Sequence, residues 1–186
     1  MITSGFAQTD AFAYDDTARC TLLCALAAQR LGEAYVRYRC DCIRLTIDLH
    51  EATGAIEPID RTTLPDYSEE WSKHNDKSIL DDWLYRLGYI AFGAAGEIEP
   101  TDKAMIVIDS RSLQCGDIAV FRPWRCNHHL ATMLDSERAV HVIKPSRFYE
   151  GQVCQIDLFA VQRFGPHRWY WADKFSYAIR LHAPWD

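Results

Sequence analysis

The chain has 186 residues, of which 48% are hydrophobic and 25% are charged, and its formal net charge is -6. This profile is typical of an ordinary globular protein with one domain and a real core. The acidic balance argues against nonspecific binding to nucleic acid, which depends on a basic surface. No apolar run approaches the roughly 20 residues that cross a membrane, and the first ten residues lack the pattern of a secretory signal.

Helical spacing of apolar residues dominates the first half of the chain. A first helix is predicted between N-cap candidates at 15–17 and Gly32, and a second between Cys42 and Gly54. The segment 55–67 is predicted as a loop. The apolar positions are Leu23, Leu26, Ala27 and Leu31 in the first helix, Leu45, Leu49 and Ala52 in the second, and Leu80, Trp83, Leu84 and Leu87 in a third.

The third helix is predicted to begin behind a capping box of Ser78 and Asp81. After this helix the apolar period changes to two, which predicts strands at 105–109, 117–121, 129–134, 139–143 and 153–161. Several of these are joined by short turns, which favours antiparallel pairing. Helices first and strands later predict an α+β domain, with N-terminal helices packed on a mostly antiparallel sheet.

Cysteines are numerous for a chain of this length. Their number is odd and their spacing shows no framework, so a disulfide scaffold is not indicated and most are interpreted as buried apolar residues. Cys42 differs from the rest because it starts a helix, where unpaired backbone N–H groups stabilise a thiolate. The seven are Cys20, Cys24, Cys40, Cys42, Cys115, Cys126 and Cys154.

Two histidines on consecutive strands supply a base for such a thiol. His129 opens its strand and shares a face with Ala131, whose small side chain leaves room for another element. His128 points the opposite way. His141 lies in the middle of the next strand, so the two rings are expected side by side. We predict that His129 takes the thiol proton and that His141 orients it.

Four segments resemble the NlpC/P60 family of cell-wall cysteine peptidases. The order Cys, His, polar residue matches that family, and so does the gap of 12 residues from His129 to His141. The segments are L-G-E-A-Y (31–35), D-C-I-R-L (41–45), C-G-D-I-A-V-F (115–121), and H-L-A-T-M-L (129–134) followed by A-V-H-V (139–142).

Other segments are similar to the branch of the family that is encoded with phage tails and gene-transfer particles. They are C-D-C before the helix, P-D-Y-S-E-E-W (65–71) and W-A-D-K-F-S-Y-A-I-R-L (171–181). The resemblance covers about residues 18–181 of a single domain, 1–186, in which 55–113 is a loop-helix insertion.

The resemblance implies a papain-like NlpC/P60 fold and a cysteine peptidase that hydrolyses amide bonds in peptidoglycan peptide stems. Cys42, His129 and His141 are the implied catalytic residues, and Tyr35 lines the site. No metal or organic cofactor is required. The implied partners are cell-wall peptide stems and tail hub or tip proteins, with no nucleic acid and no membrane insertion. The implied location is a phage-like particle, made in the host cytoplasm and degrading the wall locally during DNA delivery.

Alternatives remain open at this point. Ile43 and Arg44 follow the cysteine where the family commonly has small residues, and Val142 stands where a small residue follows the second histidine. These departures leave room for a catalytically silent tail-assembly module of the same fold. The same Cys-His chemistry also serves an amidase or acyltransferase that acts on another amide. A zinc site of Cys40, Cys42, His128 and His129 has poor spacing for tetrahedral coordination, and Cys40 is interpreted as a loop or core thiol.

Two further segments have alternative interpretations. The acidic residues around the third helix indicate a solvated helix face, or the border of a substrate groove. The aromatic cluster H-R-W-Y-W (167–171) indicates packing in the core and at the sheet edge, or a docking surface for a tail protein.

Overall fold

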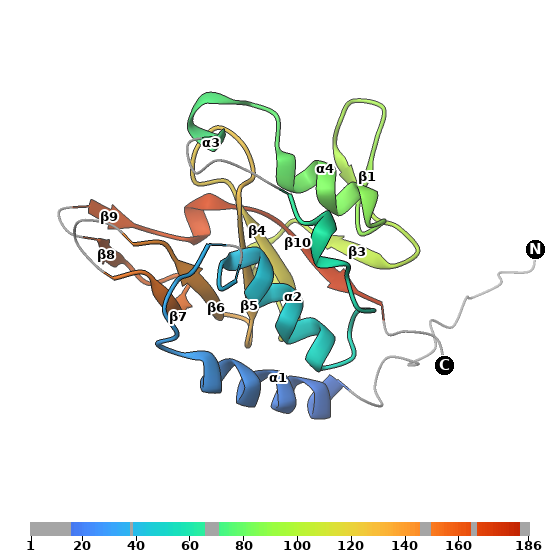
Figure 1. Ribbon diagram of the computed structural model, residues 1–186. Helices are drawn as coiled ribbons and strands as arrows, with labels where there is room; N and C mark the ends of the chain where they lie inside the picture. Colours follow the sequence, from blue (N-terminus) through green and yellow to red (C-terminus); the bar gives the residue numbers. More distant parts are fainter. Residues whose placement is uncertain (1–15, 38, 66–70, 146–149, 165–166, 183–186) are drawn as a thin grey trace, which may run out of the picture.

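The computed structural model describes residues 16–37, 39–65, 71–145, 150–164 and 167–182 (Figure 1). The helices are α1 (Asp16–Arg30), α2 (Cys42–Ala52), α3 (Trp71–His74) and α4 (Ile79–Arg86), with 3-10 turns η1 (Arg61–Thr63), η2 (Ser110–Ser112) and η3 (Ala172–Lys174). The strands are β1 (Ala91–Phe92), β2 (Ile98–Glu99), β3 (Ala104–Val107), β4 (Ile118–Phe121), β5 (His129–Met133), β6 (Arg138–Ile143), β7 (Gln152–Asp157), β8 (Gln162–Phe164), β9 (His167–Trp169) and β10 (Phe175–Leu181).

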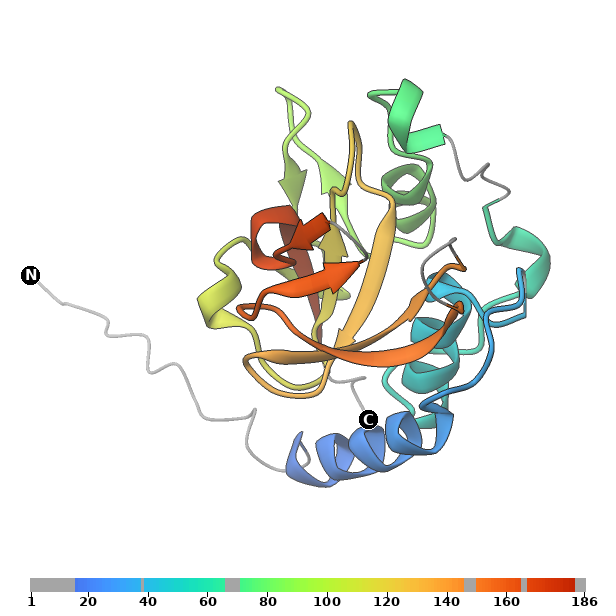
Figure 2. The ribbon, with the colours of Figure 1, turned by 90° about the vertical axis from the view of Figure 1, so that its left-hand side faces the viewer.

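A six-stranded sheet in the order β3-β10-β4-β5-β6-β7 forms the centre of the molecule, and every neighbouring pair in it is antiparallel. Helix α2 packs on β5 and β6, and α1 packs on α2 (Figures 1 and 2). The hairpins β1–β2 and β8–β9 form two small separate sheets. The predicted α+β class with a mostly antiparallel sheet is confirmed.

Strand β10 comes last in the chain but lies inside the sheet. It pairs with β3 on one side and with β4 on the other, so that Ala178 faces both Val107 and Ala119. Within the segment 171–181, the part from Phe175 onward forms this strand.

Helix α2 begins where the sequence predicts, because its first turn is capped locally. Asp41 has extended backbone and accepts a hydrogen bond on its side chain from the Arg44 N–H, at 2.9 Å. The helix ends before Gly54, whose φ of +69° places it in the left-handed region that favours glycine. These local signals fix Cys42 as the first helical residue.

The segment that leads to α2 runs along the free edge of β7. The Gly32 N–H donates to the Val153 carbonyl at 2.9 Å, and the Tyr35 N–H donates to the Gly151 carbonyl at 2.8 Å. A tight turn follows, in which the Cys40 N–H donates to the Val36 carbonyl. The L-G-E-A-Y segment thus ties the start of α2 to the edge of the sheet.

The Gly-Asp turn before β4 is held by a buried ion pair. Gly116 has a φ of +85°, and the Asp117 side chain is 1% exposed. Its two carboxylate oxygens accept from Nε and Nη2 of Arg180 on β10, both at 2.8 Å, and one also accepts from the Gln114 N–H. The turn is therefore clamped to the last strand of the chain.

The structure corrects several sequence predictions. The capping box is only half formed: Ser78 Oγ accepts from the Asp81 N–H, but the Asp81 carboxylate bonds elsewhere. The strand predicted over 153–161 ends at Asp157, because the Asp157 carboxylate accepts from the N–H groups of residues 159 and 160 and closes a turn. The loop 55–67 contains the turn η1, and residues 66 and 67 lie outside the described part, as does the cap candidate at 15.

Replacing Asp117 with Ala should destabilise the fold by about 3 kcal/mol, since Arg180 would lose a buried partner and the Gln114 N–H its acceptor. Urea unfolding measures the change. Asp76→Ala is the matched control because the Asp76–Arg125 pair is exposed, and it should cost less than about 1 kcal/mol. Equal losses in the two variants would contradict the clamp.

Candidate active site

His129 and His141 lie in direct contact, as the strand pattern predicts. His129 Nε2 and His141 Nδ1 are 2.7 Å apart, and the two rings are nearly perpendicular, at 84°. Their strands β5 and β6 are adjacent, with Thr132 facing Val140 and Met133 facing Ala139. One ring therefore holds the other in a single orientation.

Trp171, which precedes η3, covers both imidazoles. Its indole stacks on His129 with ring centroids 5.1 Å apart and an angle of 28°, and it meets His141 edge-on at 4.9 Å. Phe121 packs edge-on against the same indole. Trp171 and Ala131 belong to one buried cluster, so the room predicted beside Ala131 is filled by this indole.

Burial keeps both imidazoles neutral at neutral pH. Desolvation, helped by the neighbouring His128, lowers the pKa of His129 to about 3. Desolvation and the contact with His129 move the pKa of His141 well below its usual value. Within the described residues, His141 Nε2 is buried without a hydrogen-bond partner. A neutral ring retains a lone pair on one nitrogen and is thus able to accept a proton.

Cys42 heads the helix that packs on β5, on the face of the strand opposite to the His129 side chain. Its side chain is 7% exposed and belongs to the cluster that includes Leu130 and Val120. Side chains alternate along a strand, so Leu130 and His129 point to opposite faces. The side-chain hydrogen bond of His129 within the described residues is to His141.

The residues that flank Cys42 have distinct surroundings. Cys40 is 2% exposed, as expected of a core thiol, and burial raises its pKa to about 11. Ile43 is 3% exposed and packs in the same cluster as Cys42, so a large apolar residue fits the position after the cysteine. Tyr35 is half-buried against the cluster that contains Val153. No disulfide bond joins any of the seven cysteines, all of which lie in the described part of the chain.

A polar network missed by the sequence analysis anchors the loop before His129. Tyr177 Oη donates to Asp81 Oδ1 at 2.6 Å, and Asn127 Nδ2 donates to Asp81 Oδ2 at 2.8 Å. Ser78 Oγ donates to the Asn127 carbonyl at 2.9 Å. Asp81 is only 8% exposed, so its assignment to a solvated face is wrong. The network fixes the main chain two residues before His129.

Trp171 belongs to the aromatic cluster 167–171, for which the sequence favours packing in the core or a docking surface. It is buried, at 7% exposure, but its position over the imidazoles gives it a role that composition does not reveal. The sequence carried no signal for Asp81, Asn127 or Tyr177 as a group, because they come from three separate elements.

Comparison of the chain with family models, with curated proteins and with solved structures finds no match. Within the described residues, no helix is both long and apolar enough to span a membrane. In the same part of the chain, no group of three or more His, Cys, Asp or Glu side chains is arranged to hold a metal ion.

Trp171→Ala should raise the pKa of His129 from about 3 toward the ordinary value, because water would reach the ring that the indole now covers. NMR titration of the His129 Cε1–H signal measures it. Trp124→Ala is the control, since Trp124 is 53% exposed and contacts Trp169 rather than the histidines. An unchanged titration in Trp171→Ala would show that the indole does not exclude water.

His50 on α2 should make the fold sensitive to acid. It is 1% exposed, and burial lowers its pKa to about 4. The unfolded chain binds the His50 proton at a higher pH than the folded chain does. The free energy of unfolding is therefore highest above about pH 6.5, and it falls by about 3 kcal/mol through this residue as the pH drops toward 4. His50→Leu should flatten the curve of unfolding free energy against pH, while replacement of the exposed His74 by Leu should leave it unchanged. If the curves for His50→Leu and the parent ran parallel, His50 would not be the cause of the acid sensitivity.

Proposed function

We propose that the chain is a papain-like cysteine peptidase of the NlpC/P60 type, which hydrolyses amide bonds in the peptide stems of peptidoglycan. The observation that carries the proposal is the bond of 2.7 Å between His129 and His141, on the two strands against which the helix headed by Cys42 packs. The motif resemblance supports it, with the same order of Cys, His and His along the chain.

The tautomer of the histidine pair assigns the proton transfers. His129 Nε2 donates to His141 Nδ1 in the reactive form, which leaves His129 Nδ1 as the nitrogen with a lone pair. Because the Cys42 and His129 side chains lie toward opposite faces of β5, transfer of the thiol proton requires the thiol and the ring to meet around the start of the strand. There His129 Nδ1 accepts the thiol proton as Cys42 Sγ attacks the carbonyl carbon. Because the pKa of His129 is lowered, the reaction begins from a neutral thiol and a neutral imidazole rather than from a stored ion pair.

The first half-reaction forms a thioester and breaks the C–N bond, and His129 returns its proton to the leaving amine. Water then cleaves the thioester with His129 again acting as base. The negative oxygen of each tetrahedral intermediate needs donors. The Cys42 backbone N–H is a suitable one, since first-turn N–H groups of a helix have no intrahelical acceptor. Tyr35, half-buried before this helix, lines the substrate side in this proposal.

The biological setting belongs to the same proposal and rests on the resemblance. A tail-borne enzyme would reach the wall with the particle and open it locally during DNA delivery. Peptide stems and tail hub or tip proteins would be its partners, and its synthesis would take place in the host cytoplasm.

A second candidate is a tail-assembly module of this fold without turnover. The observation that favours it is the burial of Cys42, which is 7% exposed and lies among the apolar residues of the core. In that case the histidine pair would be a structural contact beneath Trp171. An amidase or acyltransferase would keep the Cys-His chemistry and differ in the amide that it cleaves.

Alkylation of Cys42 by iodoacetamide, measured against pH beside digestion of purified peptidoglycan, tests the proposal. We expect Cys42 of the parent to be alkylated at neutral pH, because His129 takes the thiol proton as the sulfur attacks, and we expect the parent to release wall peptides. His129→Ala should slow both by about a hundredfold or more, in line with loss of a general base. His141→Ala should lower peptide release without blocking alkylation at high pH.

His128→Ala is the matched control, because His128 is the adjacent imidazole and stands outside the His129–His141 bond. It should retain digestion. Loss of activity in His128→Ala with activity kept in His129→Ala would move the base to His128. Slow alkylation of the parent with an intact wall would favour the silent module, and cleavage of other amides without wall digestion would favour the amidase.

A further inference from the structure

Three cysteines gather where α1 lies beside the turn before β4. Cys20 and Cys24 are four residues apart on α1, so both lie on one face of that helix. Cys115 comes directly before Gly116, in the Gly-Asp turn that Arg180 clamps. Each of the three side chains is half-buried and therefore remains partly exposed to solvent. We call Cys20, Cys24 and Cys115 the thiol cluster.

Hydrogen bonds and apolar contacts hold the turn against α1. The Cys24 thiol donates to the Leu134 carbonyl at 3.6 Å, and the Gly116 N–H donates to the carbonyl of the preceding residue, Met133, at 2.9 Å. Cys115 and Leu134 both pack on the apolar cluster to which α1 contributes its buried face. The turn that carries Cys115 thus lies against the same stretch of chain as the Cys24 thiol.

The Cys115 thiol interacts with both thiols of the helix. Burial raises the pKa of Cys115 above its ordinary value, and interactions with the thiols of Cys20 and Cys24 raise it further. In the reduced protein Cys115 is therefore a neutral thiol that is held next to two others.

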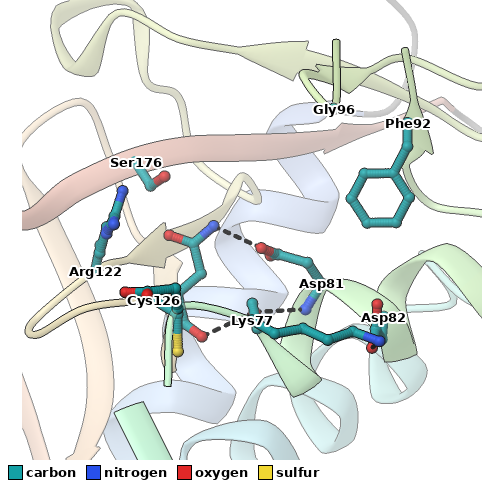
Figure 3. A pocket seen from close by; sticks show the side chains of 11 residues that line it. Lys77, Asp81, Asp82, Phe92, Gly96, Arg122, Cys126 and Ser176 are labelled. Carbon is teal, nitrogen blue, oxygen red and sulfur yellow. Dashed lines mark hydrogen bonds and ion pairs between the residues drawn. The ribbon is translucent and has the colours of Figure 1, made fainter. Parts of the chain in front are cut away.

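Two other cysteines serve for comparison, because each interacts with groups other than thiols. Cys126 lines the polar cleft beside α4 that Figure 3 shows, and the described wall of that cleft contains no second cysteine. Cys154 on β7 is half-buried, like the members of the thiol cluster, and burial alone raises its pKa, to about 11. Cys154 is therefore a matched reference for a half-buried thiol outside the cluster.

Helix geometry decides which pair in the thiol cluster is able to form a disulfide. Residues four apart on a helix have Cβ atoms about 5–6 Å apart, whereas a disulfide needs Cβ atoms about 3.5–4.5 Å apart. A bond between Cys20 and Cys24 would therefore distort α1. Cys115 belongs to a separate element and approaches both, so it is the shared partner of the two helix thiols.

We propose that the thiol cluster is an oxidation site at which Cys115 forms a disulfide with Cys20 or Cys24. The bond would join α1 covalently to the Gly-Asp turn, which is already clamped to β10 through Asp117 and Arg180. Helix α1 packs on α2, so the disulfide would also restrain the helix that begins at Cys42.

A peroxide is a suitable oxidant for this step. A helix thiolate, of Cys20 or Cys24, attacks one peroxide oxygen and breaks the O–O bond, which gives a sulfenic acid and, with the thiol proton, one water. The Cys115 sulfur then attacks the sulfenic sulfur, and its proton leaves with the hydroxyl group as a second water. The two thiols lose two electrons in total, and one molecule of hydrogen peroxide takes them up.

The chemistry of the thiol cluster does not depend on the proposed function, but the time at which the disulfide forms does. A cytoplasm keeps thiols reduced, and disulfides persist in oxidising surroundings outside it. In a particle that is assembled in the cytoplasm and acts outside, the bond would form after release. It would then hold α1 in place when the protein works at the wall.

Peptide mapping after treatment with hydrogen peroxide tests the disulfide without any turnover. The full chain is used as Cys42→Ala, so that the proposed nucleophile takes no part. Mass spectrometry should find the tryptic peptide 112–125 joined to the tryptic peptide 20–30 of the same chain. The midpoint of thermal unfolding should rise by about 5 °C or more, and dithiothreitol should reverse the rise, because the bond closes a long loop.

Replacement of single thiols identifies the partners. Cys115→Ser should abolish the joined peptide and the rise in the midpoint, and so should Cys20→Ser combined with Cys24→Ser. Either replacement on α1 alone should keep both, because the other helix thiol still lies beside Cys115. Cys154→Ser is the matched control and should change neither result. Circular dichroism melting of the reduced proteins verifies that each variant folds.

Three results would overturn the proposal: a parent in which Cys115 stays unlinked, a bond between Cys20 and Cys24 alone, or bonds only between chains. A joined peptide with an unchanged midpoint would overturn the restraint on α1. A joined peptide in Cys42→Ala, together with a parent that leaves the wall intact, would uphold the disulfide and remove the peptidase. Wall digestion by a parent whose Cys115 stays unlinked would do the reverse.

Discussion

The segment from Trp171 to Leu181 constrains the rest of the structure, because it contacts each part of the candidate site. Strand β10 fills the space between β3 and β4, so the sheet is continuous only when the end of the chain is in place. Arg180 then clamps the Gly-Asp turn, Tyr177 holds Asp81, and Trp171 covers the histidines. Since these partners are distant in sequence, the core and the site both depend on long-range pairing, which is intrinsically slow to form.

Desolvation of the histidine pair affects both the stability of the fold in acid and the protonation state of the two imidazoles. Burial under Trp171 disfavours the charged imidazole, which weakens the fold in acid but keeps the ring neutral near pH 7. A neutral ring is the form that a general base requires. The buried His141 Nε2, which has no partner within the described residues, adds a cost of about 1–3 kcal/mol. A purely structural contact could avoid that cost with apolar side chains, which weighs in favour of a function for the pair.

The sequence predicted those parts of the site that depend on local signals. The start of α2 follows from Asp41 and Gly54, and the meeting of His129 with His141 follows from two strands joined by a short turn. The cover by Trp171 and the bond between Asp81 and Tyr177, 96 residues apart, depend on where β10 enters the sheet, which no local pattern encodes. The hairpin strands β1 and β2 have two residues each, too few to show a period.

The packing of α4 against α2 sets the geometry that the proposed chemistry needs. The loop before His129 is tied to α4 through Ser78 and Asp81, whereas the thiol moves with α2. The two helices meet in one apolar cluster that contains Cys42 and Ile47 of α2 and Trp83 of α4. A shift of about 1 Å between them would move the nucleophile relative to the base, and errors of that size are enough to cost about a hundredfold in rate. Apolar packing between α2 and α4 would therefore act on the proposed reaction as directly as the polar residues.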